Sequence, residues 1–505
     1  MVGKVLSAAP VGFYGQLIDV EGDLSTGLPS LQIVGLGNKA IDEAKDRVRS
    51  AIKNSLLDFP KGKIVINLAP AELPKDGTQY DLAIALTILQ LGGILSPAEL
   101  SGALFVGELA LNGDVRPIKS AISAAETAKL NGLTTLYAPK ANSGQALLID
   151  GIEVIPVASL KELFLHLKGE SKISPAAKDN TSETTRKTPK TTLDHIHGQD
   201  QAKRAAAISV AGRHNILLSG SPGSGKTMLA RALNSLMPPL SDPEIIEVSK
   251  LHSLGGETVD EIIYARPFRS PHHTASRVSI IGGGAKATPG EISLAHRGTL
   301  FMDELLEYPR STLEALRQPM EDRVISVSRA QGKYTYPADF ILVGTMNPCP
   351  CGYYGDSEKS CSCSSIQILN YQKRLSGPLL DRIDLTVTVS RVAHEDLLGR
   401  KTLSNSQHKQ YALSIEQAVK RQRNRYKSSN KYNGSLSSQE VDNFIKLSDD
   451  SKDFLIAAAK KLDLSARSYF KIIKVAQTIA DLEAQNSVQV PHLAEALSYR
   501  QINVA

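Results

Sequence analysis

The sequence predicts an α/β protein of three domains: an α+β domain in 1–167, a parallel-sheet α/β domain in 193–393 and a helical domain in 394–505. Three observations carry this prediction. Residues 168–192 are rich in Lys, Ser, Thr and Pro and nearly lack large apolar side chains, so they are expected to form a linker. In the middle domain, apolar runs of strand length alternate with helix-like stretches. After it, the strand signal disappears.

The composition is that of an ordinary multidomain globular protein. At 505 residues the chain is too long for one hydrophobic core, and 42% hydrophobic with 22% charged residues is not the composition of a disordered or fibrous chain. No stretch reaches the roughly 18 consecutive apolar residues of a membrane span, and residues 1–11 lack the apolar run of a signal peptide. We therefore expect a cytoplasmic protein without a membrane partner. The net charge of +6 is compatible with a polyanionic partner but carries little weight alone.

The first domain combines strand and helix signals. The run Lys63-Ile-Val-Ile-Asn-Leu68 is strand-like, whereas 81–91 and 120–131 show helical periodicity, and Gly-rich turns separate such stretches. In the middle domain, four apolar runs of strand length predict a parallel sheet with helices on both faces. These runs are 215–219, 299–302, 340–344 and 385–389. The last domain is expected to be a helical lid.

A glycine-rich motif follows the first of these runs. It reads Gly220-Ser-Pro-Gly-Ser-Gly-Lys226-Thr227 and opens a helical stretch at 228–236, which is the context of a phosphate-binding P-loop and not of an ordinary Gly-rich turn. In a P-loop, backbone N–H groups face the phosphates, the lysine reaches the β and γ phosphates and the hydroxyl ligates Mg²⁺. The predicted nucleotide-binding residues are Gly220, Ser221, Pro222, Gly223, Ser224, Gly225, Lys226 and Thr227.

An acidic pair follows the second apolar run, in Gly298-Thr-Leu-Phe-Met-Asp303-Glu304. An apolar run that ends in two acids is more often a plain strand end, but downstream of a P-loop it suits ATP hydrolysis. We assign Asp303 to Mg²⁺ and Glu304 to the base that activates water. Asn347 follows the third run and would sense the γ-phosphate if that strand neighbours the other two.

All four cysteines lie in one short insertion, 349–363. Four thiolates in two pairs are enough for a tetrahedral structural Zn²⁺ site, although one intervening residue within each pair is fewer than usual. Free thiols and a redox switch are the alternatives, and disulfides are not expected in a reducing compartment. The four predicted ligands are Cys349, Cys351, Cys361 and Cys363. The adjacent His272 and His273 are expected to point in different directions and to serve a loop rather than a metal.

These motifs resemble AAA+ proteins of the magnesium-chelatase-like group. The resemblance rests on the P-loop, Asp303-Glu304, Asn347, Leu-Leu-Asp-Arg382 and Ser-Ala-Arg467, and covers nearly the whole chain. Arg269-Ser-Pro-His-His-Thr274 and Met-Asn-Pro-Cys-Pro-Cys indicate the ComM (YifB) branch.

Two arginines acquire roles through this resemblance alone. Arg382 would be the finger that a neighbouring subunit inserts into the ATP site, and Arg467 the second sensor, on the lid. By themselves, both could equally be surface arginines. A finger acting between subunits implies a ring, expected to be a homo-hexamer.

The group also carries two candidate pore loops. Here these are 278–288, with Lys286, and 327–336, with Arg329 and Lys333. Their basic side chains would contact a phosphate backbone, while ordinary solvated loop charge is an equally good interpretation.

The first domain resembles the proteolytic domain of Lon proteases, through the segments 74–81 and 107–118. That domain uses a serine–lysine dyad, but the matching positions here are Gln79 and Ile122. An amide is no nucleophile and an alkyl chain is no base, so Lys75 and Lys119 nearby have nothing to activate. We expect a scaffold used for ring assembly or for contacts with DNA or a partner, not a protease.

The resemblance implies an ATP-driven hexameric motor on branched, double-stranded or single-stranded DNA. It would migrate branches during recombination in natural transformation, with ATP and Mg²⁺ as cofactors. The main rival is a magnesium-chelatase-type motor that acts on a protein or tetrapyrrole. An ATP-dependent protease and a non-enzymatic assembly factor that only switches shape are further alternatives.

Overall fold

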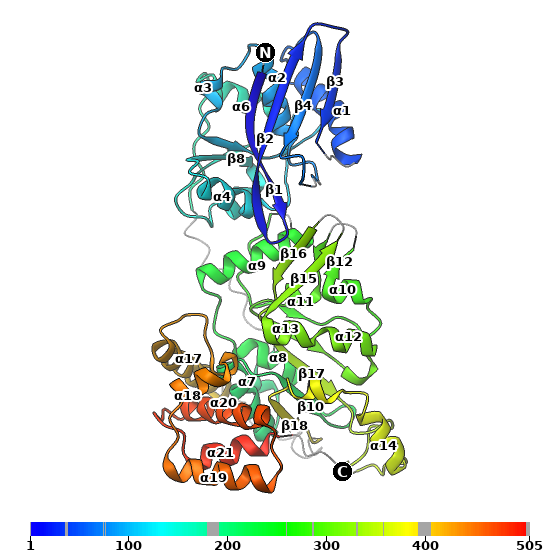
Figure 1. Ribbon diagram of the computed structural model, residues 1–505, viewed down its shortest axis with the longest axis vertical. Helices are drawn as coiled ribbons and strands as arrows, with labels where there is room; N and C mark the ends of the chain where they lie inside the picture. The colour runs from blue at the N-terminus through cyan, green and yellow to red at the C-terminus, as the bar shows by residue number, and fades with distance from the viewer. Residues whose placement is uncertain are drawn as a thin grey trace.

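The computed structural model describes residues 2–35, 39–73, 75, 77–178, 191–258, 260–284, 287–329, 332–356, 358–391 and 406–500. The molecule is elongated, with the N-terminal domain at one end and the helical domain beside the other end of the middle domain (Figure 1). The segments 179–190 of the predicted linker and 392–405 at the start of the predicted lid lie outside the described residues, as does Lys286.

Two main sheets form the N-terminal domain. The first has the order β1-β2-β4-β3, in which β3 and β4 are parallel and the other pairs antiparallel, and the second is parallel, in the order β5-β8-β9. Their strands are β1 (Val2–Val11), β2 (Tyr14–Ser25), β3 (Ser30–Val34), β4 (Lys63–Ala69), β5 (Ala103–Phe105), β8 (Thr135–Pro139) and β9 (Glu153–Val157), and β6 (Glu108–Leu109) pairs with β7 (Val115–Arg116). The helices are α1 (Lys39–Asn54), α2 (Asp81–Leu91), α3 (Pro97–Leu100), α4 (Ala121–Leu130), α5 (Ser143–Ala146) and α6 (Leu160–Leu167).

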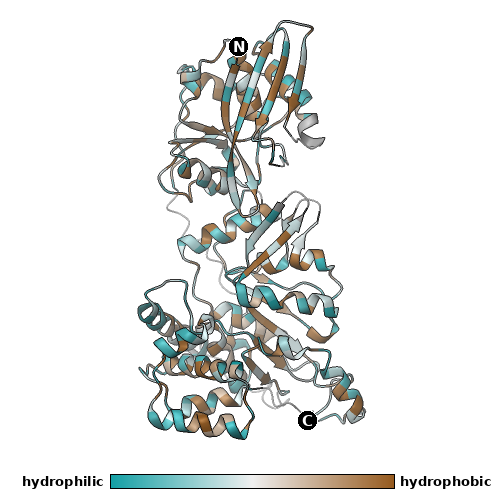
Figure 2. Ribbon diagram, in the orientation of Figure 1, coloured by the Kyte–Doolittle hydropathy of each residue, from teal (hydrophilic) through white to brown (hydrophobic). Residues whose placement is uncertain are grey.

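Helix α2 is the centre of this domain. All its residues are buried, because its sequence is apolar on every face and helix α1 and the first sheet enclose it. Strand β4 instead alternates buried and more exposed positions along its length, and Figure 2 shows brown and teal stretches in the strands of this sheet. The predicted strand at 63–68 and the predicted helices at 81–91 and 120–131 are β4, α2 and α4.

The middle domain is a five-stranded parallel sheet in the order β11-β14-β17-β10-β18. Its strands are β11 (Phe268–Arg269), β14 (Thr299–Met302), β17 (Ile341–Met346), β10 (Ile216–Ser219) and β18 (Leu385–Thr388). The helices are α7 (Asp200–Gly212), α8 (Lys226–Leu236), α9 (Asp242–Gly255), α10 (Arg277–Ile281), α11 (Glu291–Leu294), α12 (Arg310–Ala315), α13 (Arg317–Asp322), α14 (Ser365–Gln372) and α15 (Gly377–Leu380). The parallel sheet is confirmed, and all four predicted apolar runs lie on its strands. The third strand extends two residues beyond the predicted run, to Met346, and all of its residues are buried.

The helical domain packs directly on this sheet. Its helices are α17 (Ser406–Tyr426), α18 (Ser438–Phe444), α19 (Asp449–Lys461), α20 (Ala466–Leu482) and α21 (Val490–Ser498). Ile479 of α20 and Leu493 of α21 belong to the same buried cluster as Ile216 of the sheet and Ala206 of α7. The helical C-terminus is therefore confirmed. Within the described ranges, no helix is both long and apolar enough to cross a bilayer.

Residues 168–178, which the composition assigns to the linker, lie against the N-terminal domain. The backbone N–H of Ala176 donates to the carbonyl of Val154 at 2.8 Å, and Lys168 pairs with Glu99 at 3.0 Å. Side-chain composition could not reveal this segment's backbone pairing to β9.

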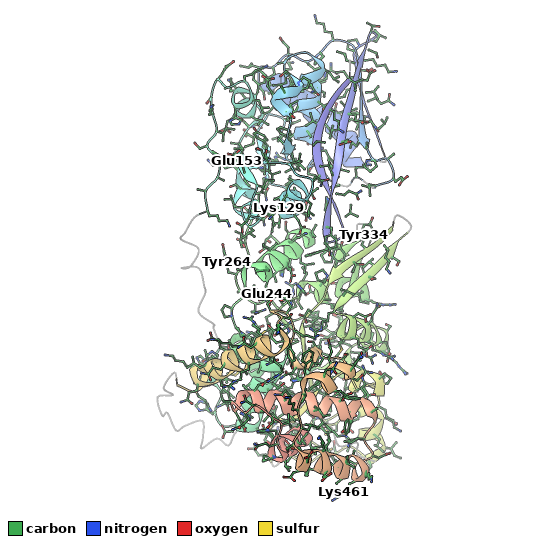
Figure 3. All side chains as sticks on the ribbon, turned by 60° about the vertical axis from the view of Figure 1, so that its left-hand side comes forward. Lys129, Glu153, Glu244, Tyr264, Tyr334 and Lys461 are labelled. Carbon is green, nitrogen blue, oxygen red and sulfur yellow. The ribbon has the colours of Figure 1, made fainter. Side chains whose placement is uncertain are left out.

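The N-terminal domain sits on α9 of the middle domain. Lys250 of α9 is 1% exposed, pairs with Glu126 and places its ammonium 4.4 Å from the Phe13 ring centroid. The backbone N–H of Ser120 donates to Ser253 Oγ at 3.1 Å. Figure 3 shows the β1–β2 hairpin reaching down to Tyr334 of the middle domain. The two domains thus share a contact that includes a buried cation.

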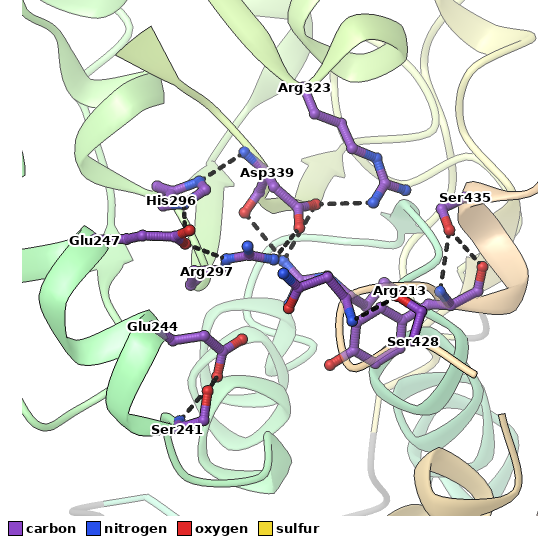
Figure 4. A network of polar contacts seen from close by, with 12 residues as sticks. Arg213, Ser241, Glu244, Glu247, His296, Arg297, Arg323, Asp339, Ser428 and Ser435 are labelled. Carbon is purple, nitrogen blue, oxygen red and sulfur yellow. Dashed lines mark hydrogen bonds and ion pairs between the residues drawn. The ribbon is translucent and has the colours of Figure 1, made fainter. Parts of the chain in front are cut away.

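A buried charge network closes the edge of the sheet where β14 and β17 begin (Figure 4). The Asp339 carboxylate pairs with Arg297 at 2.8 Å, Arg323 at 3.3 Å and Arg213 at 3.5 Å. Although burial favours the neutral acid, these arginines hold the pKa of Asp339 well below its usual range. Because the strands are parallel, this network lies at the edge opposite to the P-loop.

Candidate nucleotide site

Three predicted site segments meet at the carboxyl edge of the parallel sheet. Strand β17 lies between β14 and β10, so Asn347 after β17 is flanked by Asp303 after β14 and Gly220 after β10. The register pairs Ser219 with Met346. The condition on which the Asn347 prediction depended, a shared neighbourhood of the three strands, is met.

The P-loop needs glycine for two reasons. At Gly220, a Cβ would lie 2.3 Å from the carbonyl oxygen of Val389, so no side chain fits. Gly225 has φ of +89°, a conformation that L side chains rarely adopt, and caps the start of α8. The loop therefore leaves β10 in close contact with the backbone after β18. Its last residues begin α8, and the N-terminus of that helix favours phosphate.

Lys226 lies at the centre of the predicted site. Its Nζ donates to the carbonyls of Gly220 at 2.6 Å and Ser221 at 3.0 Å and to Asn347 Oδ1 at 3.3 Å. Burial lowers the pKa of Lys226, and the charges of Asp303 and Glu304 oppose that shift. The lysine, the acids and the amide are thus in electrostatic reach of one another.

A threonine that sequence reasoning missed organises the acidic pair. Thr345 is fully buried; its Oγ1 donates to Asp303 Oδ1 at 2.5 Å and accepts from the Glu304 backbone N–H at 2.9 Å. Glu304 has φ of +50°, which turns the chain out of β14 at this residue. Thr345 therefore fixes the direction of the Asp303 carboxylate and the course of the backbone at Glu304. Its only signal in the sequence is its position two residues before Asn347.

A cavity of about 380 Å³ adjoins the P-loop and is large enough for part of a nucleotide. Its residues come from the P-loop, from the segment before α7 and from two later loops: His195, Ile196, His197, Gln199, Pro222, Gly223, Ser224, Gly225, Met228, Glu358 and Arg391. Gln199 Nε2 donates to the carbonyl of Ser224 at 2.7 Å, which joins the two walls. None of the residues outside the P-loop was predicted, because only folding brings them there.

Thr227, Arg382 and Arg467 occupy different places. Thr227 is exposed on the first turn of α8, on the same sheet edge as Asp303. Arg382 pairs with Glu321 at 2.7 Å and donates to the carbonyl of Pro378 at 2.6 Å, and Arg467 also pairs with Glu321. The polar contacts of both arginines are with these groups and not with the P-loop. The structure thus separates the two arginines from Lys226 of the same chain.

The candidate pore loops are two hairpins. Strand β12 (Gly282–Gly283) pairs with β13 (Thr288–Pro289), and β15 (Val324–Arg329) pairs with β16 (Gly332–Pro337). Lys333 is exposed beside the turn of the longer hairpin, opposite Ser328, and Arg329 ends β15. This hairpin contacts the N-terminal domain, since a Cβ at Gly12 would lie 3.4 Å from Tyr334.

The four cysteines converge. Their Sγ atoms all lie within 4.8 Å of one another, with Cys349 at 3.3 Å from Cys351 and 3.6 Å from Cys361. Zn–S bonds of about 2.3 Å in a tetrahedron place sulfurs about 3.8 Å apart, so the donor set fits Zn²⁺ in number, type and spacing. By contrast, the expectation that His272 and His273 point in different directions was wrong: their ring centroids are 4.1 Å apart, and His272 Nδ1 forms a 2.8 Å hydrogen bond with Thr274 Oγ1.

The two positions expected to match the Lon dyad are buried. Gln79 is 7% exposed, just before α2, and Ile122 is fully buried in α4. The carbonyl of Gln79 accepts from the N–H of Gly107 at 3.0 Å, and Lys75 Nζ donates to the carbonyl of Pro70. These two positions offer packing and backbone bonds, not a nucleophile and its base.

A P-loop, an acidic pair on the next strand but one, an amide on the strand between them and a packed helical domain define an ATPase of the AAA+ class. Three family models match the chain: "Magnesium chelatase, subunit ChlI" at 192–397, "Subunit ChlI of Mg-chelatase" at 20–142 and "Magnesium chelatase, subunit ChlI C-terminal" at 405–500. The chain belongs to the ComM/YifB family of magnesium-chelatase-like proteins, as its relatives indicate.

The similarity to YifB and ComM extends over nearly their full length. The uncharacterized protein YifB of Escherichia coli (strain K12) is 41% identical over 502 residues, which covers 99% of this chain and 97% of YifB. Competence protein ComM of Haemophilus influenzae is 41% identical over 501 residues, 98% of this chain and 97% of ComM. The magnesium-chelatase 67 kDa subunit of Heliobacterium mobile is 26% identical over 193 residues, 32% of this chain and 29% of that subunit.

Proposed function

We propose that this ATPase is a hexameric DNA motor that migrates branches in recombination during natural transformation. The carrying observation is that Lys226, Asp303, Glu304 and Asn347 gather at one site, while Arg382 lies elsewhere on the same chain. We infer that a neighbour supplies the finger arginine, which requires a ring. The link to DNA uptake rests on the similarity to the competence protein ComM.

Each of these residues has a separate role in ATP hydrolysis. The P-loop amides and Lys226 bind the phosphates, and Glu304 accepts the proton of the attacking water. Asn347 orients that water toward the γ-phosphate, and Thr345 keeps Asp303 and Glu304 in place. Thr227 and Asp303 would hold Mg²⁺, which neutralises phosphate charge. The neighbour's arginine at position 382 stabilises the charge that develops in the transition state.

DNA is proposed to contact the two hairpins as it moves through the ring. Lys333 and Arg329 flank the turn of β15–β16, and Lys286 belongs to the other loop. Contacts of this kind with phosphates are independent of sequence and weaken with salt. The N-terminal domain is proposed to be a Lon-like scaffold without peptidase activity. It touches the longer hairpin through the β1–β2 turn, so it can follow movements of that hairpin.

The test is ATP hydrolysis by the purified protein without nucleic acid, with duplex DNA and with a synthetic four-way junction. The proposal expects the junction to stimulate turnover most, and salt to reduce that stimulation. A control with Lys333→Ala should lower the stimulation and leave the basal rate unchanged. Equal rates of ATP hydrolysis in all three conditions would contradict the proposal that this ATPase acts on DNA.

A magnesium-chelatase-type motor is the second candidate. It is favoured by the family models and by the partial match to the chelatase subunit of Heliobacterium mobile. Its hallmark would be ATP turnover that responds to a protein or tetrapyrrole partner and not to DNA.

A further inference from the structure

The segment that carries the four cysteines, residues 349–363, lies against the P-loop; we call it the cysteine loop. Gly352 has φ of +86°, and a Cβ there would lie 2.7 Å from Cδ of Pro222 in the P-loop. Asp356 forms a side-chain hydrogen bond with Ser221; this bond, with backbone hydrogen bonds and the charge of Arg391, lowers the pKa of Asp356 to about 2. The cysteine loop therefore touches two successive P-loop residues.

Arg391, after β18, fastens this contact from the other side. Its Nη2 donates to the carbonyl of Pro222 at 3.2 Å, and its Nε lies 3.3 Å from the carboxylate of Asp356. Its guanidinium also lies 5.5 Å from the Tyr353 ring centroid, and Nη1 pairs with Glu358 at 3.2 Å. One arginine thus joins the P-loop to the middle of the cysteine loop, at the wall of the nucleotide cavity.

The cysteine loop also begins at the nucleotide site. Asn347, which accepts from Lys226, precedes Cys349 by two residues, and the carbonyl of Pro348 between them accepts from Gln372 Nε2 at 3.0 Å. The chain therefore contacts the site at Asn347, passes through the first cysteine pair and returns to the P-loop at Asp356 before the second pair.

A metal is the natural means to hold such a loop. Between the two pairs, residues 352–360 read Gly-Tyr-Tyr-Gly-Asp-Ser-Glu-Lys-Ser, with too few apolar side chains to form a core. The ends of a polar loop separate unless something closes it, and metal binding free energy can supply that closure. The four Sγ atoms within 4.8 Å provide the ligands.

We propose that Zn²⁺ bound by the four cysteines fixes the P-loop for nucleotide through Asp356 and Arg391, so that loss of the metal weakens nucleotide binding. Zn²⁺ thus acts here as a positioning element for the ATP site and not only as a local fold support. This inference rests on the proposed ATP site. It goes beyond the proposed site in that the metal, together with the P-loop, determines the affinity for nucleotide.

The experiment measures zinc content and the affinity for a fluorescent ATP analogue on the full-length protein. The as-purified protein should contain one zinc per chain, and removal by a chelator should weaken binding about tenfold, the effect of one charge-assisted contact. Restoring Zn²⁺ should recover the affinity. Full affinity without metal, or four free thiols in the as-purified protein, would overturn the proposal.

Variants that keep all cysteines separate coupling from misfolding. Arg391→Ala and Asp356→Asn should retain one zinc per chain and show the same loss of affinity. Arg374→Ala is the matched control, since Arg374 is 54% exposed and pairs with Glu307, which is not a residue of the cysteine loop. Wild-type affinity in both loop variants would contradict the coupling. If zinc-loaded wild-type protein binds no ATP analogue at all, the nucleotide site itself fails.

Discussion

Arg382 and Arg467 belong to different domains and pair with the same carboxylate, Glu321 of α13. Arg382, just before β18, lies 2.7 Å from Glu321 Oε2, and Arg467, at the start of α20, contacts Oε1. The Arg382 side chain is 11% exposed, and its Nε has no hydrogen-bond partner among the described residues. One acid thus joins the two arginines on one surface of the chain, and the proposed ring would present Arg382 from this surface to a neighbouring ATP site.

Arg382→Ala should bind ATP normally and hydrolyse it at least ~10³-fold more slowly, the range seen for arginine fingers. Mixing with Lys226→Ala subunits should restore part of the activity, since those subunits supply the arginine to intact sites. Phosphate release across mixing ratios measures this. If mixing restores no activity, the role of Arg382 between subunits is contradicted.

Glu321→Gln should raise ATP turnover without much change in stability. The two arginines oppose the effect of burial and keep the pKa of Glu321 below its ordinary value, so the acid is charged at neutral pH. Its side chain is 44% exposed, and exposed ion pairs contribute only about 0–1 kcal/mol. Removing the charge frees the arginines for a phosphate. Glu314→Gln, whose acid pairs with Arg317 within one helical turn, is the control; equal rates in both variants contradict the role.

Lys226→Ala should abolish ATP binding, whereas Glu304→Gln should keep binding and lose at least ~10²-fold in hydrolysis, the contribution of a general base. Equilibrium binding of a fluorescent ATP analogue and phosphate release distinguish the two effects. Normal turnover in either variant would refute the site assignment.

Asp339→Asn should lower the free energy of unfolding by about 3–5 kcal/mol, because it leaves the buried Arg213 without its acid and removes one of the ion pairs of Arg297 and Arg323. Urea unfolding at pH 7 measures the change. Asp449→Asn, at a carboxylate that is 95% exposed, should change it little. Similar losses of unfolding free energy in both variants would contradict the stabilising role of the network.

Acidification should lower the stability of the fold partly through protonation of Glu247, the acid that pairs with Arg297. Burial raises its pKa, but hydrogen bonds from His296 and Arg297 outweigh that effect and lower the pKa to about 2. A lowered carboxyl pKa stabilises the fold above the unfolded value, about 4.3, and this stability is lost as the pH falls toward 2. Glu247→Gln should therefore lose less stability than wild type between pH 4.5 and 2 in thermal melts. Parallel losses would contradict this.

The sequence predicts what depends on local pattern. Buried strands read as apolar runs, and the acids and amide at their ends could be placed because parallel strands end at one edge. Thr345, Arg391 and Glu321 carried no such signal, since their roles come from neighbours distant in the sequence. The backbone bond of Ala176 and the turned ring of His272 likewise depend on contacts that composition does not encode.

The most direct test of the account is strand displacement from a labelled four-way DNA junction by wild-type protein and Glu304→Gln with ATP and Mg²⁺. If the proposed function is right, wild type takes the junction apart into duplexes in an ATP-dependent way, and Glu304→Gln binds the junction but leaves it intact. A wild-type protein that hydrolyses ATP and leaves the junction whole would contradict the claim that this ATPase is a branch-migration motor.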